Sequence, residues 1–175
     1  GEEVLWYGRR VFALDGTTLA LESVEELRGD FPPARNQHGK CHNPLLFLGL
    51  AHDVLSGVAV RPVWGAMYGD KTTSEQRMAR ESLARLEPGS VVLGDRNYGC
   101  FSVVWSAAEN KHDVIFRLKE KQAEKILGKG AGQSRDESVV WSVSAADRKT
   151  TPEIPEEATI EGRVVILSKS VGGKR

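Results

Sequence analysis

The sequence predicts an α/β fold built on a mixed five-stranded sheet with flanking helices. Two observations lead to this prediction. Three strand-like apolar runs come first along the chain, and two more then alternate with two amphipathic segments of helical period. We expect the first three strands to be antiparallel, and the last two to run parallel to the first through right-handed crossovers.

The first three strands are apolar runs separated by turn-forming residues. They are expected at residues 11–14, with 18–22 as a continuation or a return, at 45–51 and at 57–64. Asp53 and Gly57 lie between the last two runs, where they favour the turn of a β-hairpin. Residues 23–44 are rich in Pro, Gly, Asn and charged residues, a composition typical of a loop.

Two helices and two further strands complete the expected sheet. Thr72 and Glu75 fit the capping box T-x-x-E, in which each side chain bonds to the other residue's free backbone N–H. Apolar residues then recur with helical spacing, and a second helix is expected at 101–110. The strands that follow the two helices are expected at 90–95 and 113–119.

The composition bounds the class of protein without naming a function. Hydrophobic residues make up 40% of the 175 residues, enough for a buried core, and 24 Lys plus Arg balance 24 Asp plus Glu. A net charge of zero lacks the basic excess that usually marks nucleic-acid binding, although a local basic face is compatible with it. The two cysteines form no CxxC motif, which fits a reducing cytoplasm, and no signal peptide or membrane-spanning run is found.

The composition changes at about residue 119. Residues 1–118 hold the α/β pattern, whereas 119–175 begin with a charged, Gly-rich stretch and continue with two strand candidates at 138–145 and 158–168. We expect this tail to be all-β and separate from the first part. The sequence begins without Met and stops after a strand-like run, so we expect it to be a piece of a larger protein.

Two aspartates follow short buried strands. Asp15 ends the first expected strand, and Asp95 ends the strand in VVLGDRNYG. Carboxylates at the ends of adjacent parallel strands could lie close together, and hard oxygen ligands select Mg²⁺ or Mn²⁺, which can drive phosphoryl transfer. The alternative is that each aspartate caps a turn, because DGT and GDRN are both good turn sequences, and for either residue taken singly the turn is favoured.

Taken together, the two aspartates lie in a longer pattern. The segments FALDGTTLAL, DFPPARNQHG, LEPGSVVLGDRNYG and VVWSAAENKHDVIFRLK resemble bacterial insertion-sequence transposases of the DDE class, which have an RNase H-like catalytic core, and the resemblance covers most of residues 10–120. The most specific match is LEPGSVVLGDRNYG, which is similar to the block that carries the family's second carboxylate. The resemblance implies that Asp15 and Asp95 are the first two catalytic, metal-binding carboxylates. It also implies that Arg96 and Tyr98 shape the site or contact DNA phosphate.

The third carboxylate of that family is a glutamate in the pattern Y-x₂-R-x₃-E-x₆-K. Glu75 is the only acidic residue at the required distance from a tyrosine, but Lys71 and Ser82 replace the Arg and the Lys of the pattern. A helix cap explains Glu75 better, so we expect the third carboxylate to lie outside this chain. Many relatives carry a β-rich insertion before that glutamate, and residues 119–175 resemble its beginning. The chain alone is therefore expected to be inactive.

The resemblance implies a function for the whole enzyme. It would cleave transposon ends by two-metal phosphoryl transfer and join the freed 3′-hydroxyl to target DNA, in the bacterial cytoplasm on chromosomal or plasmid DNA. The implied partners are the transposon ends, the target DNA and further copies of the full-length enzyme, with no membrane. Two alternatives stay open, an RNase H-like nuclease and a catalytically inactive DNA-binding or scaffolding module.

Three weaker patterns suggest other chemistry. LDGTT is similar to the D-x-D-G-T loop of haloacid-dehalogenase-type phosphatases, but Ala13 stands where that family has its nucleophile. His38, Cys41 and His42 invite a zinc site, yet no clear fourth ligand is present, which favours a solvated loop. Trp141 could stack on a flipped DNA base, although a core tryptophan on a strand is the better interpretation.

Overall fold

The computed structural model describes residues 5–36, 39–40, 42–128 and 134–167. The chain divides into two compact units, residues 1–117 and 118–175. This division lies one residue before the boundary expected from the change in composition.

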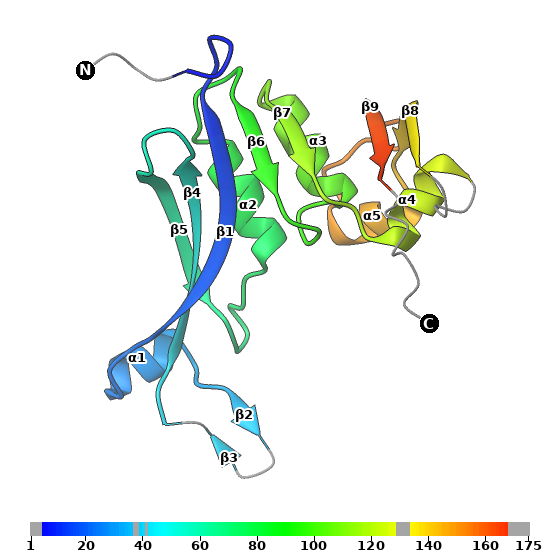
Figure 1. Cartoon of the computed structure of the whole chain (residues 1–175). Helices are drawn as coiled ribbons and strands as arrows, with labels where there is room; N and C mark the ends of the chain where they lie inside the picture. The colour runs from blue at the N-terminus through cyan, green and yellow to red at the C-terminus, as the bar shows by residue number, and fades with distance from the viewer. Residues whose placement is uncertain (1–4, 37–38, 41, 129–133, 168–175) are drawn as a thin grey trace, which may run out of the picture. The chain divides into compact units, whose positions relative to one another are not determined.

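The first unit is built on a mixed sheet of five strands in the order β5-β4-β1-β6-β7. The strands are β1 (Val11–Ala20), β4 (Leu45–Asp53), β5 (Ala59–Ala66), β6 (Val91–Gly94) and β7 (Asp113–Phe116). As Figure 1 shows, β1, β4 and β5 are antiparallel, whereas β6 and β7 run parallel to β1. The predicted mixed sheet is confirmed.

Two helices, α2 (Glu75–Leu83) and α3 (Phe101–Glu109), lie on one face of this sheet (Figure 1). Both confirm helices expected from the apolar spacing. The core forms between these helices and the sheet because the apolar side of each element is buried there. Its buried members are Phe12, Leu14, Ala51, Ala79, Leu83, Leu86, Val92, Tyr98, Val103 and Ala107.

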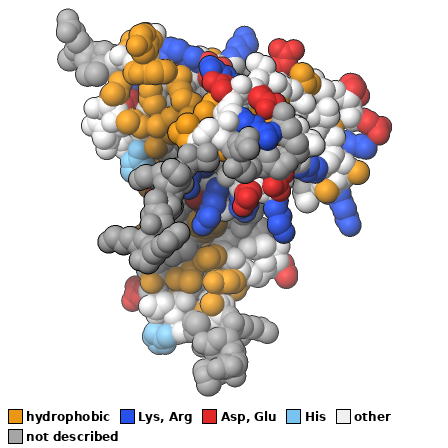
Figure 2. Space-filling model, turned by 45° about the vertical axis from the view of Figure 1, so that its right-hand side comes forward, with side chains coloured by type: hydrophobic (Ala, Val, Ile, Leu, Met, Phe, Trp, Pro, Cys, Tyr) orange, Lys and Arg blue, Asp and Glu red, His pale blue; other side chains and the backbone are white. Residues whose placement is uncertain are grey.

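The opposite side of the sheet carries large hydrophobic side chains that are partly exposed. Strand pairing places Leu19, Trp64 and Ile115 on the side of the sheet that faces away from the core, and they are 46%, 61% and 60% exposed. Hydrophobic side chains are accordingly visible at the surface in Figure 2.

Strand β1 is longer than predicted, which corrects the position of one aspartate. Asp15 does not end the strand but lies in its middle, opposite Leu50 of β4. The Gly-Thr-Thr that follows Asp15 reads locally as a turn, but β4 pairs with β1 as far as Ala20 and holds these residues extended. Tertiary pairing therefore overrides the local turn preference.

The predicted hairpin is formed by β4 and β5. Its turn depends on Asp53, whose Oδ1 accepts hydrogen bonds from the backbone N–H groups of Leu55 and Ser56 at 3.0 and 2.9 Å. Gly57 follows with φ of +72°, a conformation that glycine adopts at little cost. Both residues singled out from the sequence thus form the turn.

The segment 23–44, expected to be a loop throughout, contains short regular elements. They are α1 (Glu25–Asp30), β2 (Arg35–Asn36) and β3 (Gly39–Lys40), the last two paired with each other. The loop composition concealed α1 because a helix of 6 residues leaves little room for a periodic apolar pattern.

Helix α2 begins two residues later than its predicted cap requires. Ser74, not Thr72, is the N-cap, and its side chain accepts a hydrogen bond from the N–H of Arg77 at 3.1 Å. The Thr72 hydroxyl instead donates to the carbonyl of Met67 at 2.8 Å. Glu75 is consequently the first residue of the helix and not the third, so the predicted capping box is wrong.

In its described residues, the second unit contains a two-stranded antiparallel sheet and two helices. The elements are α4 (Glu120–Leu127), β8 (Arg135–Ser142), α5 (Ala145–Thr150) and β9 (Thr159–Ile166). The two expected strands are present and antiparallel, but the prediction of an all-β tail is wrong. A capping box between Ser144 and Asp147 starts α5 and was overlooked in the sequence. Trp141 lies on β8 opposite Ile160 and is half-buried, so it lies on a strand as expected but is not a fully buried core residue.

Candidate functional site

Asp15 lies in β1, and Asp95 directly follows the adjacent parallel strand β6. The last residue pair between β1 and β6 is Ala13 with Leu93, and Asp15 and Asp95 each lie two residues beyond it. Asp95 is the first residue after β6, and both aspartates are exposed. The strands β1 and β6 are adjacent and parallel, as expected, but only Asp95 lies at a strand end. That the two side chains converge stays a prediction.

Each carboxylate already makes one local hydrogen bond. Asp15 Oδ1 accepts from the N–H of Gly16 at 2.9 Å, and Asp95 Oδ1 accepts from the N–H of Asn97 at 2.7 Å. The bond of Asp95 is the turn cap that the alternative interpretation expected. Since an ionised carboxylate has two oxygens and about four acceptor positions, a turn-capping role and a metal-binding role are compatible.

Tyr98, three residues after Asp95, belongs to the buried core. It is only 3% exposed, and its hydroxyl donates a hydrogen bond to Oε1 of Glu75 at 3.0 Å. Burial raises the pKa of the Tyr98 hydroxyl above its ordinary value of 10.0, and the charge and hydrogen bond of Glu75 raise it further. The charges of Asp15 and Asp95 raise the pKa in the same direction. The phenol is therefore a neutral donor among three carboxylates.

Glu75 is the residue of this region whose role sequence reasoning missed. It comes from the first turn of α2 and points toward β1, where a Cβ atom added to Gly16 would lie 3.0 Å from its Oε1. The absence of a side chain at Gly16 thus leaves room for the glutamate. The T-x-x-E pattern predicted a capping role for Glu75, and no local signal in the sequence connected Glu75 with Tyr98.

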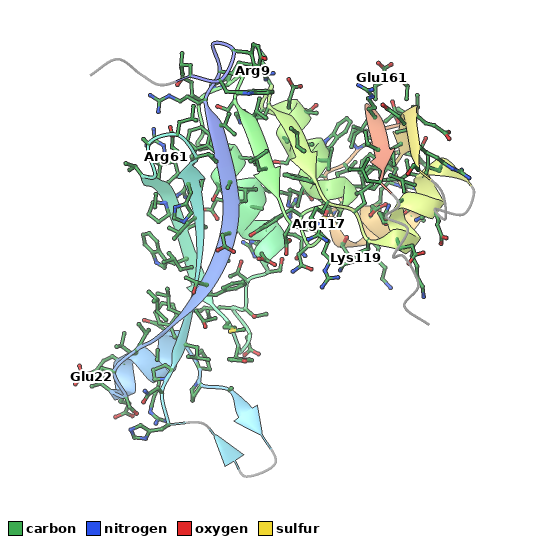
Figure 3. All side chains as sticks on the ribbon, in the orientation of Figure 1. Arg9, Glu22, Arg61, Arg117, Lys119 and Glu161 are labelled. Carbon is green, nitrogen blue, oxygen red and sulfur yellow. The ribbon has the colours of Figure 1, made fainter. Side chains whose placement is uncertain are left out.

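The basic residues near the carboxylates differ in their surroundings. Arg96 is exposed directly after Asp95. Arg117 is exposed just beyond β7, where its backbone N–H donates to the carbonyl of Gly94 at 3.1 Å, and Figure 3 labels it at this strand end. Tyr98, by contrast, is buried. Of the two roles predicted for Tyr98, its burial supports shaping the site and not contact with DNA.

The donor chemistry of Asp15 and Asp95 fits a hard divalent ion, because both offer exposed carboxylate oxygens. Among the described residues, no three His, Cys, Asp or Glu side chains are grouped so that they could hold a metal ion. The two aspartates could supply only part of a coordination shell, and water would fill the other positions. His38 and Cys41 of the zinc hypothesis lie outside the described residues, and His42 is exposed.

Comparison with known proteins gives no family for this chain. No protein-family model matches it, and no curated protein is significantly similar to it. In the part of the chain that the structure describes, every helix is too short or too polar to cross a lipid bilayer.

Proposed function

We propose that this chain carries the first two carboxylates of a metal-dependent phosphoryl-transfer site that acts on DNA. The observation that supports this proposal is that β1, which contains Asp15, runs parallel to the adjacent strand β6, which Asp95 follows directly. More particularly, we assign the chain to the RNase H-like core of a DDE-class transposase. The five-stranded mixed sheet is compatible with that fold, and the motif resemblance over residues 10–120 supports the assignment.

The residues of the site have distinct tasks in this proposal. Asp15 and Asp95 would hold Mg²⁺ or Mn²⁺, which supplies an activated water and stabilises the leaving oxygen when bound. Arg96 and Arg117 flank Asp95 and would offset the charge of a DNA phosphate. Tyr98 keeps its proton, donates a hydrogen bond to Glu75 and is influenced by the charges of both aspartates.

The metal site can be tested with the chain as it exists. Binding of Mn²⁺ is followed by electron paramagnetic resonance for the parent chain, Asp15→Asn and Asp95→Asn, with Asp70→Asn as a control at another exposed aspartate. We expect the parent chain and the control to bind one weak Mn²⁺, and each of the two site variants to lose about tenfold or more in affinity. Equal binding by all four proteins would overturn the proposal.

The transposase assignment needs a second experiment. A longer version of the chain that includes a Y-x₂-R-x₃-E-x₆-K helix is incubated with plasmid DNA that carries the transposon ends and with Mn²⁺. We expect nicking followed by strand joining, both lost in Asp95→Asn. Nicking without joining would favour the nuclease alternative, and neither activity in a folded, Mn²⁺-binding protein would favour the inactive module.

A further inference from the structure

Two consecutive residues at the start of α2 reach the turn that carries Asp95. The Tyr98 hydroxyl donates to Oε1 of Glu75 at 3.0 Å, and Nε2 of Gln76 donates to the carbonyl of Asn97 at 3.2 Å. The turn is also closed on itself, because the N–H of Tyr98 donates to the carbonyl of Asp95 at 3.2 Å. The first turn of α2 therefore holds two of the three residues that follow Asp95.

These bonds are partly shielded from water. Tyr98 is 3% exposed, while Glu75 and Gln76 are half-buried. The end of β6 is tightly packed as well, since a Cβ atom on Gly94 would lie 2.7 Å from Phe116 and 3.1 Å from the Cβ of Tyr98. A hydrogen bond to an ionised carboxylate in such surroundings is stronger than one in water.

We infer that Glu75 and Gln76 are positioning residues that fix the turn after β6 and thereby hold the Asp95 carboxylate beside Asp15. Through Tyr98 and Asn97, the start of α2 sets the affinity of the two-aspartate site for a divalent ion. This inference rests on the proposed function, because it assumes that the two aspartates bind the ion.

The geometry favours positioning over direct coordination by Glu75. Glu75 is not grouped with Asp15 and Asp95 as a three-ligand site among the described residues, whereas its Oε1 does accept a hydrogen bond from the Tyr98 hydroxyl. The two roles respond differently to a conservative change. Glutamine keeps an oxygen that accepts from Tyr98 but has no charge for a metal, whereas alanine loses both.

The experiment measures Mn²⁺ affinity for Glu75→Gln, Glu75→Ala, Tyr98→Phe and the Glu75→Ala/Tyr98→Phe pair. We expect Glu75→Gln to stay within about threefold of the parent chain, and each of the other single variants to lose about tenfold. The pair should lose no more than either single variant, because both changes break the same bond. Equal losses in Glu75→Gln and Glu75→Ala would overturn the inference in favour of a direct ligand, and unchanged affinity in Glu75→Ala would overturn it altogether.

Two additions make the outcome decisive. Asp15→Asn and Asp95→Asn are measured in the same assay, and if they bind like the parent chain, the proposed function fails and not only the positioning role. If Glu75→Ala does not fold, Gln76→Ala serves instead, since it removes only the bond to Asn97. We expect about a threefold loss of Mn²⁺ affinity and faster hydrogen exchange of the Asn97 amide in Gln76→Ala. An unchanged affinity would overturn the inference.

Discussion

Ala13 of β1 and Leu93 of β6 are paired in parallel register, and each lies two residues before one of the two aspartates. This pairing is held from the core side by Phe12 and Val92, which are 3% and 0% exposed. The relative position of the aspartates is therefore set by buried packing next to them and not by the exposed carboxylates. Substitutions that neutralise the carboxylates should accordingly leave the fold intact, which makes the metal-binding experiments interpretable.

Asp53 should make the stability of the first unit depend on pH. Hydrogen bonds from the N–H groups of Ser56 and Leu55 lower the pKa of Asp53, and burial opposes this shift. The charge of Arg10, whose Nη1 lies 3.5 Å from Oδ2 of Asp53, lowers the pKa further. Because the pKa is lower in the folded protein, the stabilisation is present above the unfolded value of about 3.8 and is lost as the pH falls through the folded value. Urea unfolding should show Asp53→Ala less stable than the parent chain by about 1–3 kcal/mol at neutral pH.

The matched control for this prediction is Asp53→Asn, which keeps an oxygen for the turn but has no charge. It should cost less than the alanine variant at neutral pH, and its difference from the parent chain should disappear in acid. Parallel pH profiles of stability for Asp53→Asn and the parent chain would contradict the prediction.

Arg61 lies in a bulge of β5 with a strained backbone. Ala51 pairs with Val60 and Gly49 with Val63, so two residues of β5 face a single residue of β4, and Arg61 has φ of +53° (labelled in Figure 3). A left-handed conformation suits glycine and is worst for β-branched residues. Arg61→Gly should therefore be more stable than Arg61→Val by about 1–2 kcal/mol in urea unfolding. Both variants remove the guanidinium, so equal stability would show that the backbone is not strained there.

The N-cap of α2 can be tested by replacing Ser74 and Thr72 separately with alanine. Ser74→Ala should destabilise the first unit by about 1 kcal/mol, because the N–H of Arg77 loses its acceptor. Thr72→Ala should cost less, since its exposed hydroxyl only donates to Met67. Thermal unfolding of both variants checks this order, and a larger loss in Thr72→Ala would restore the capping box expected from the sequence.

The parts of the fold that were predictable are those in which a local pattern and the tertiary contacts agree. The apolar runs of β4, β6 and β7 and the helical spacing of α2 and α3 reflect burial against one core. The errors arose where a local signal was overridden, as at Asp15, whose Gly-Thr-Thr is held extended by β4. They also arose where elements are too short to show a period, as in α1 and α5.

The candidate site divides in the same way. Asp15 and Asp95 were identifiable because each follows a short apolar run, and the order of strands and helices makes those strands neighbours. The bond between Tyr98 and Glu75 joins residues 23 positions apart on different elements. Periodicity and spacing in a sequence do not predict such a contact. The helix-cap role predicted for Glu75 also left no reason to look for a second one.

The last prediction is that this chain alone neither cuts nor joins DNA. Two aspartates can hold one divalent ion loosely, with water at its remaining positions. A second ion requires more negative charge, and without it the leaving oxygen of the phosphodiester is not stabilised. The test incubates the 175-residue chain and a version extended through a glutamate-bearing helix with supercoiled plasmid and Mn²⁺. Nicking by the shorter chain that disappears in Asp95→Ala would reveal a further ligand within it, and Glu75 and Glu109 would be the first residues to substitute.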